Sequence, residues 1–130
     1  MKKILLGLLL MFMFAGCSVL STKPADKLMG KEYILVDSSD EVKISLNFAE
    51  ENFFGFSGVN NYFGKYKVEG NKLVINHVGS TLMAGPKQLM DTEYNYISKL
   101  DKVEKYKIEG KKLILTTNDG NNLVFIEFAK

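Results

Sequence analysis

Apolar and polar residues alternate along most of the chain, which is the pattern of β-strands with one buried face. In the segment 42–48 every second residue is apolar and the residues between them are polar. Further strands are expected at 33–37 and 53–59, and the glycines in the second of these favour a bulge or a close approach of the backbone. The first part of the domain therefore predicts antiparallel strands packed on one core.

One strand–turn–strand pattern occurs twice. The segment 66–75, Tyr-Lys-Val-Glu-Gly-Asn-Lys-Leu-Val-Ile, recurs 40 residues later as 106–115, Tyr-Lys-Ile-Glu-Gly-Lys-Lys-Leu-Ile-Leu. The glycine in each copy suits a tight hairpin turn, because it adopts positive φ at little cost. The alternation predicts that Tyr66 and Tyr106 point inward. Two copies are too few for a solenoid, so we expect equivalent hairpins in one sheet.

Helical periodicity occurs in 86–100, between the two hairpins, with Pro86 expected at the first helical position. Its predicted apolar stripe consists of Leu89, Met90, Tyr94, Ile97 and Leu100. A last hairpin is expected from 111–117 and 122–128. The predicted fold class is α+β, with about eight mostly antiparallel strands in a strongly curved sheet or small open barrel. One helix follows the fifth strand and covers an opening.

The N-terminus has the features of an export signal. Two lysines precede the uncharged apolar segment 4–14, whose 11 residues are too few for a membrane-spanning helix of about 20. The segment ends in Phe-Ala-Gly followed by Cys17, the only cysteine of the chain, and this sequence resembles a lipobox. An ordinary signal peptide that leaves Cys17 as a free thiol is the alternative.

These features divide the chain into a signal peptide (1–16), a lipidated tether (17–27) and a folded domain (28–130). We predict a membrane anchor through lipid on Cys17. The protein would then face the periplasm from the outer membrane if the organism has one, and otherwise lie on the outer face of the plasma membrane. Ten flexible residues reach on the order of 15–20 Å, so the domain would stay close to the membrane.

Composition excludes several classes of function. Of the 17 basic residues, all lysine, two belong to the signal peptide, which leaves 15 against 15 acidic residues. A neutral domain without arginine gives no basis for nucleic-acid binding. With Cys17 lipidated no thiol remains, and one histidine cannot supply the three or four ligands of a zinc site. We expect no cofactor and no metal.

Catalytic candidates are few. His77 is the sole histidine, and an edge or loop position without partners is favoured over a base or ligand. Ser80 and Thr81 lack the surroundings of an activated nucleophile, so a turn or capping role is favoured. The acidic residues at 37–41 and 50–51 fit solvated turns.

A group of aromatic residues stands apart from these candidates. Its members are Phe53, Phe54, Phe56, Tyr62 and Phe63. Alternating strand faces cannot both pack on one core, so some of these rings could line an exposed groove. Core packing is the preferred interpretation.

Three spaced blocks, Gly30–Leu35, Phe56–Tyr66 and Ser80–Pro86, resemble the META domain, typified by bacterial HslJ lipoproteins. The resemblance covers about Leu28 to Phe128 and continues through Glu93 in the helix. It implies a structural role for the motif positions Gly58, Asn60, Gly64, Tyr66, Thr81 and Pro86. The family is associated with the cell envelope, with heat or stress response and with antibiotic tolerance, and has no established enzymatic activity.

The chain departs from the family at two cysteines. Many members carry Gly-Cys-Asn in the first motif and Ala-Cys-Pro in the second, and these cysteines are thought to pair. Here the two positions are Val59 and Gly85. The resemblance therefore implies that Val59 and Gly85 lie within reach of a disulfide. Tyr33 stands where the family commonly has tryptophan.

Three functions remain open. The first is a monomeric, non-enzymatic envelope lipoprotein that acts through contacts with a protein partner. The second is a carrier or chaperone for a lipid or another apolar ligand held in the barrel. The third, the least favoured, is an enzyme that uses His77 or Ser80. A filled core with exposed aromatic residues would favour the first and an unfilled apolar cavity the second.

Overall fold

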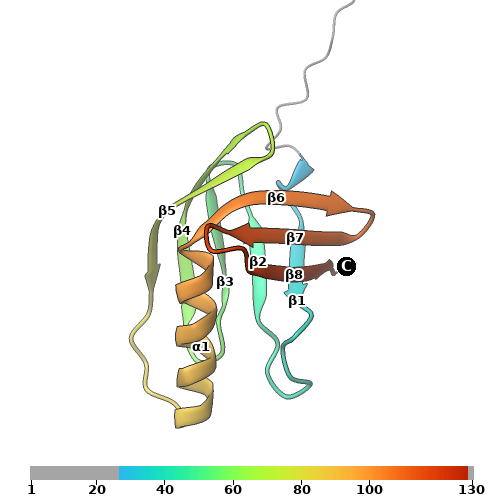
Figure 1. Ribbon diagram of the computed structural model, residues 1–130. Coiled ribbons are helices and arrows are strands. Elements are labelled where there is room, and N and C mark those ends of the chain that lie inside the picture. The colour runs from blue at the N-terminus through green and yellow to red at the C-terminus, as the bar shows by residue number, and fades with distance from the viewer. Residues whose placement is uncertain (1–26, 129–130) are drawn as a thin grey trace, which may run out of the picture.

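The computed structural model describes residues 27–128, which form one antiparallel sheet and one helix (Figure 1). The elements are β1 (Glu32–Leu35), β2 (Ser45–Phe48), β3 (Asn52–Phe56), β4 (Asn61–Glu69), β5 (Lys72–Ser80), α1 (Lys87–Leu100), β6 (Val103–Glu109), β7 (Lys112–Thr117) and β8 (Asn122–Glu127). Each strand pairs with the next along the chain, and β1 pairs with β8, so the sheet closes into a barrel.

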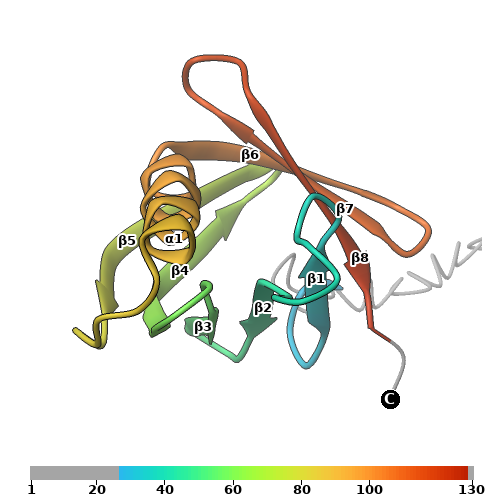
Figure 2. The same cartoon turned by 90° about the horizontal axis from the view of Figure 1, so that it is seen from below.

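This architecture confirms the predicted fold class, eight antiparallel strands with one helix after the fifth. The closure is uneven, because β5 and β6 share only the pair Lys72↔Lys105. Seen from below, α1 lies next to β4 and β5 on the concave side of the sheet (Figure 2). None of the helices in the described part of the chain is long and apolar enough to cross a membrane.

The duplicated hairpins are β4–β5 and β6–β7, as predicted. Their turns place Gly70 at φ 62° and Gly110 at φ 61°, the left-handed conformation that glycine adopts without strain. Tyr66 is buried and its hydroxyl donates to the carbonyl of Ala49 at 2.5 Å, while Tyr106 is half-buried against the same core. The inward direction predicted for both tyrosines is confirmed.

The barrel interior is filled by apolar side chains from every strand and from α1. They are Leu28, Tyr33, Leu35, Ile44, Leu46, Phe48, Phe53, Tyr62, Tyr66, Leu73, Tyr96, Leu100, Val103, Leu113, Leu115, Leu123 and Phe125. At the centre, the Tyr62 hydroxyl donates to the carbonyl of Ser45 at 2.5 Å and lies 2.6 Å from the Tyr96 hydroxyl. Burial raises the pKa of both tyrosines, which stay neutral.

The predicted stripe of α1 was wrong in part. The buried residues are Glu93, Tyr96 and Leu100, whereas Tyr94 is 73% exposed. These buried residues are three and four positions apart, the spacing of one helix face, but the charged Glu93 among them hides the pattern in the sequence. Pro86 precedes the helix as its N-cap rather than opening it, and its carbonyl accepts the first helical hydrogen bonds.

A bulge bends the β4–β5 pair. Phe63 lies opposite Gly79 and Lys65 opposite Asn76, so β5 has one residue more than β4 in this stretch. The extra residue is accommodated at His77, which has φ 55°. Histidine is one of the few non-glycine residues enriched at positive φ. The exposed His77 therefore has a conformational explanation.

Candidate functional site

Part of the family motif meets at a buried carboxylate. Glu93 of α1 is 8% exposed, and its Oε1 accepts hydrogen bonds from Ser57 Oγ at 2.5 Å and from the backbone N–H groups of Asn60 at 2.6 Å and Val59 at 3.3 Å. Its Oε2 accepts from Asn60 Nδ2 at 2.8 Å. Ser57 Oγ also lies 2.9 Å from the carbonyl of Asn60, but it has one proton, and the shorter distance assigns that proton to the carboxylate.

Asn60 connects this carboxylate to the chain segment that leads into α1. Its Oδ1 accepts from Thr81 Oγ1 at 2.9 Å and from the backbone N–H of Met83 at 2.7 Å. Its Nδ2 also reaches the carbonyl of Met83 at 3.1 Å. We call Ser57, Asn60, Thr81 and Glu93 the Glu93 clamp, because they join α1, the β3–β4 connection and the segment 81–86.

Gly58 allows the clamp to form. It has φ 131°, and a Cβ at this position would lie 3.3 Å from the carbonyl oxygen of Leu89 and 3.7 Å from Cβ of Glu93. A side chain would therefore strain the backbone and crowd α1. The remaining three motif positions have other roles: Gly64 gives room to the ring of Phe53, Tyr66 belongs to the core, and Pro86 is the N-cap of α1.

Two opposing effects set the charge of Glu93. Burial raises the pKa of the carboxyl group, but the hydrogen bonds donated by Ser57, Asn60 and Val59 favour the charged form and together outweigh it. The pKa of Glu93 therefore lies below its ordinary value of 4.5, and the group is a carboxylate at neutral pH.

This arrangement suits a structural clamp better than acid–base catalysis. Both carboxylate oxygens accept hydrogen bonds from the protein and the side chain is buried, so the carboxylate is not presented to a substrate. His77 and Ser80 are exposed on β5, and the structure does not bring either into the clamp. The Thr81 hydroxyl donates a hydrogen bond to Asn60 Oδ1, and the N-cap of the helix is Pro86. Among residues 27–128 no three His, Cys, Asp or Glu side chains are grouped to hold a metal ion.

The positions of the missing family cysteines are adjacent. A Cβ built on Gly85 would lie 3.4 Å from Cβ of Val59, close to the separation of about 3.5–4.5 Å in disulfides. Gly85 is not among the glycines at positive φ. The expected proximity of Val59 and Gly85 is confirmed.

The aromatic group divides between the two faces of the sheet. Phe53 and Tyr62 are buried, whereas Phe54, Phe56 and Phe63 are exposed on the outside, Phe54 at 50% and Phe63 at 53%. We call these three residues the aromatic face. Phe54 and Phe63 are direct neighbours across β3 and β4.

A surface hollow of about 440 Å³ lies on this face. It is lined by Ser45, Asn47, Phe54, Gly55, Phe56, Asn61, Tyr62 and Phe63. The preference for core packing was therefore wrong for three of the five rings, since they lie on the outward side of their strands.

The barrel and the clamp define the class of protein, an eight-stranded antiparallel barrel with one helix held to it by a buried carboxylate. The META domain family model matches residues 25–130, and the chain belongs to this family. No curated protein matches the sequence significantly.

Solved structures show the same fold. An NMR structure of a protein from Burkholderia xenovorans has a TM-score of 0.67 at 23% identity and covers 82% of this chain and 87% of that chain. A second NMR structure has a TM-score of 0.62 at 21% identity, covering 78% and 92%. A DUF4847-family protein from Bacteroides vulgatus has a TM-score of 0.52 at 17% identity, covering 67% and 60%.

Sequence reasoning missed one member of the clamp and the function of another. Ser57 carries no signal of its own in the sequence, and the family resemblance includes Glu93 without indicating that its carboxylate is buried. A polar residue at helical spacing between Leu89 and Tyr96 could have indicated a buried carboxylate. The predicted anchor, Cys17, lies outside the described residues.

Proposed function

We propose that this META-domain protein is a lipid-anchored protein of the cell envelope that acts through contacts with other proteins and not by covalent chemistry. The observation that carries the proposal is the aromatic face, which lies outside a barrel filled by its own side chains. Exposed aromatic side chains around a hollow are typical of protein contact surfaces.

The filled interior supports this proposal over the carriage of a lipid. A carrier needs an apolar cavity that its ligand can occupy. Here large rings such as Tyr62, Tyr96 and Phe125 pack against one another at the centre, with ring centroids 5.4 and 6.3 Å apart. A lipid chain would have to displace them.

The N-terminal sequence supports the anchor. A short apolar segment followed by Cys17 fits lipidation and retention at a membrane. A role in envelope stress or antibiotic tolerance rests on the family resemblance, and it supplies the phenotype with which the proposal is tested.

The experiment replaces the aromatic face in the full-length chain as Phe54→Ser/Phe56→Ser/Phe63→Ser. The protein is extracted from membranes in mild detergent with any bound partner, and the size of the resulting complex is measured. Growth of the cells under heat and antibiotic stress is measured in parallel. The matched control is Leu82→Ser/Tyr94→Ser, which removes exposed apolar side chains elsewhere. We expect the triple variant to lose both the complex and the stress phenotype while the control keeps them. If a folded triple variant behaves like the wild type, the aromatic face is not the contact surface.

A further inference from the structure

Strands β5 and β6 meet at one residue pair and then separate. The pair is Lys72↔Lys105, and the backbone N–H of Tyr106 donates to the carbonyl of Asn71 at 3.1 Å beside it. Beyond Lys72, β5 continues to pair with β4, but within residues 27–128 no strand lies on its other side. In the antiparallel pattern the Leu73 N–H completes this same bridge, so within the segment 73–75 the strand edge is free from the Leu73 carbonyl onward, inside an otherwise closed sheet.

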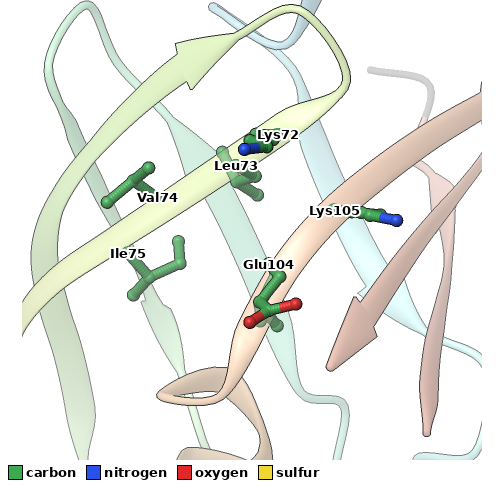
Figure 3. Close-up of a pocket in the computed structure, with 7 residues that line it drawn as sticks. Lys72, Leu73, Val74, Ile75, Glu104 and Lys105 are labelled. Atoms are coloured by element: carbon green, nitrogen blue, oxygen red, sulfur yellow. The ribbon is translucent and has the colours of Figure 1, made fainter. Parts of the chain in front are cut away.

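The separation leaves a hollow of about 280 Å³ between the two strands (Figure 3). It is lined by Lys72, Leu73, Val74, Ile75, Val103, Glu104 and Lys105. Its volume is slightly below the range of about 300–1,000 Å³ for small-molecule pockets. Leu73 and Val103 are buried, so the floor is apolar and suits an aliphatic side chain.

Charge is unevenly distributed around this hollow. Lys72 and Lys105 are direct cross-strand neighbours, and like charges in such a pair are unfavourable. The ion pairs of the described chain involve other lysines, so neither has an acidic partner there. Glu104 precedes Lys105 in β6 and lies on the side of this pair where the two strands separate. The paired end of the hollow is therefore positive.

We propose that an extended acidic segment of a partner protein adds as a strand to the free edge at 73–75. Its backbone would pair with β5, an aliphatic side chain would enter the hollow, and an acidic side chain would lie beside Lys72 and Lys105. The inference rests on the proposed function, because it names the kind of partner segment. It uses a surface separate from the aromatic face.

The first test measures peptide binding to the full-length chain in detergent by fluorescence anisotropy. The probe is a fluorescein-labelled six-residue peptide of alternating valine and glutamate. We expect saturable binding that weakens about tenfold or more when lysine replaces glutamate, because two attractive charge pairs become repulsive. Methylation of the backbone nitrogens along one edge of the peptide should abolish binding, since strand pairing needs those N–H groups.

Charge reversal at the hollow supplies the second test. Lys72→Glu/Lys105→Glu should reverse the preference to the valine–lysine peptide, whereas Lys43→Glu/Lys111→Glu, with the same change in net charge, should not. Equal binding of both peptides, insensitivity to methylation, or no saturable binding up to about 1 mM would overturn the inference. The triple variant of the aromatic face should still bind the peptide. If peptide binding fails while that variant loses its complex, this inference falls and the proposed function stands.

Discussion

Replacement of Glu93 tests the role of the clamp most directly. Glu93→Ala removes the acceptor of four hydrogen bonds, from Ser57 Oγ, from the backbone N–H groups of Val59 and Asn60, and from Asn60 Nδ2. A buried donor left without a partner costs about 1–3 kcal/mol, and disruption of a buried charged network typically costs about 3–5 kcal/mol in total. We expect Glu93→Ala to lower the unfolding free energy by about 3–5 kcal/mol, since the four bonds share one carboxylate and their contributions are not additive.

Glu93→Gln should cost less, about 2 kcal/mol, for a reason that the geometry supplies. The amide oxygen can replace Oε1, but the amide nitrogen then faces Asn60 Nδ2, and both are donors. Asn60 cannot turn over to correct this, because its Oδ1 already accepts from the backbone N–H of Met83, which can only donate. The mismatch therefore persists in the variant.

Urea denaturation of the chain from residue 25 onward at pH 7 measures both effects, with Asp91→Asn as the control. Asp91 forms an exposed ion pair with Lys87 on the same helix, so its loss should cost less than about 0.5 kcal/mol. If Glu93→Ala costs no more than this control, the clamp does not hold α1 to the barrel.

The same variants give a pH test. Because the pKa of Glu93 is lowered in the folded protein, its contribution is present above the ordinary pKa of 4.5 and is lost as the pH falls through the folded value. The difference in unfolding free energy between wild type and Glu93→Gln should therefore shrink between pH 6 and about pH 3. A constant difference over this range would mean that the charge of Glu93 contributes nothing.

Three further predictions concern single positions. His77→Gly should change the unfolding free energy by at most about 1 kcal/mol, whereas His77→Val should lower it by about 1–2 kcal/mol, because a β-branched residue resists positive φ; equal urea midpoints would contradict this. In the variant Val59→Cys/Gly85→Cys the unfolding free energy should rise by about 3 kcal/mol when the two cysteines are oxidised, and this gain should be lost on reduction. Gly85→Cys alone should lower the unfolding free energy, because its side chain crowds Val59. A gain that is unaffected by reductant would refute the bridge. Cys17→Ser should prevent processing and lipidation at this site, seen as a precursor without incorporated labelled fatty acid, and normal processing of the variant would exclude the anchor.

The fold was predictable because its signals are local. Period-two alternation and the two copies of Tyr-Lys-x-Glu-Gly locate strands and turns from neighbouring residues alone. The inward direction of Tyr66 follows from the same alternation. The bounds of α1 were also predictable, since the helical periodicity at 86–100 matches the observed helix within one residue and both end at Leu100.

The clamp and the aromatic face were less predictable because both depend on how separate elements are placed against each other. Glu93 meets partners 33 to 36 residues earlier in the chain, and a local pattern shows only a charge on a helix. The outward direction of Phe63 follows from the alternation that turns Tyr66 inward, but its place beside Phe54 depends on the register of β3 with β4, which no single strand specifies. The conformation of His77 likewise follows from a mismatch in length between two paired strands.

The free edge of β5 follows from the path of the chain, and the clamp maintains it. β6 meets β5 at Lys72, where β5 begins, so the chain must return along the whole of β5, about 26 Å at 3.3 Å per residue. The 14 residues of α1 cover about 21 Å of that return at 1.5 Å per residue. A helix cannot supply the backbone partners of a strand, since its own N–H and carbonyl groups are already paired. While Glu93 holds α1 in place, β6 cannot extend its pairing along β5, and the segment 73–75 stays open to a strand from elsewhere.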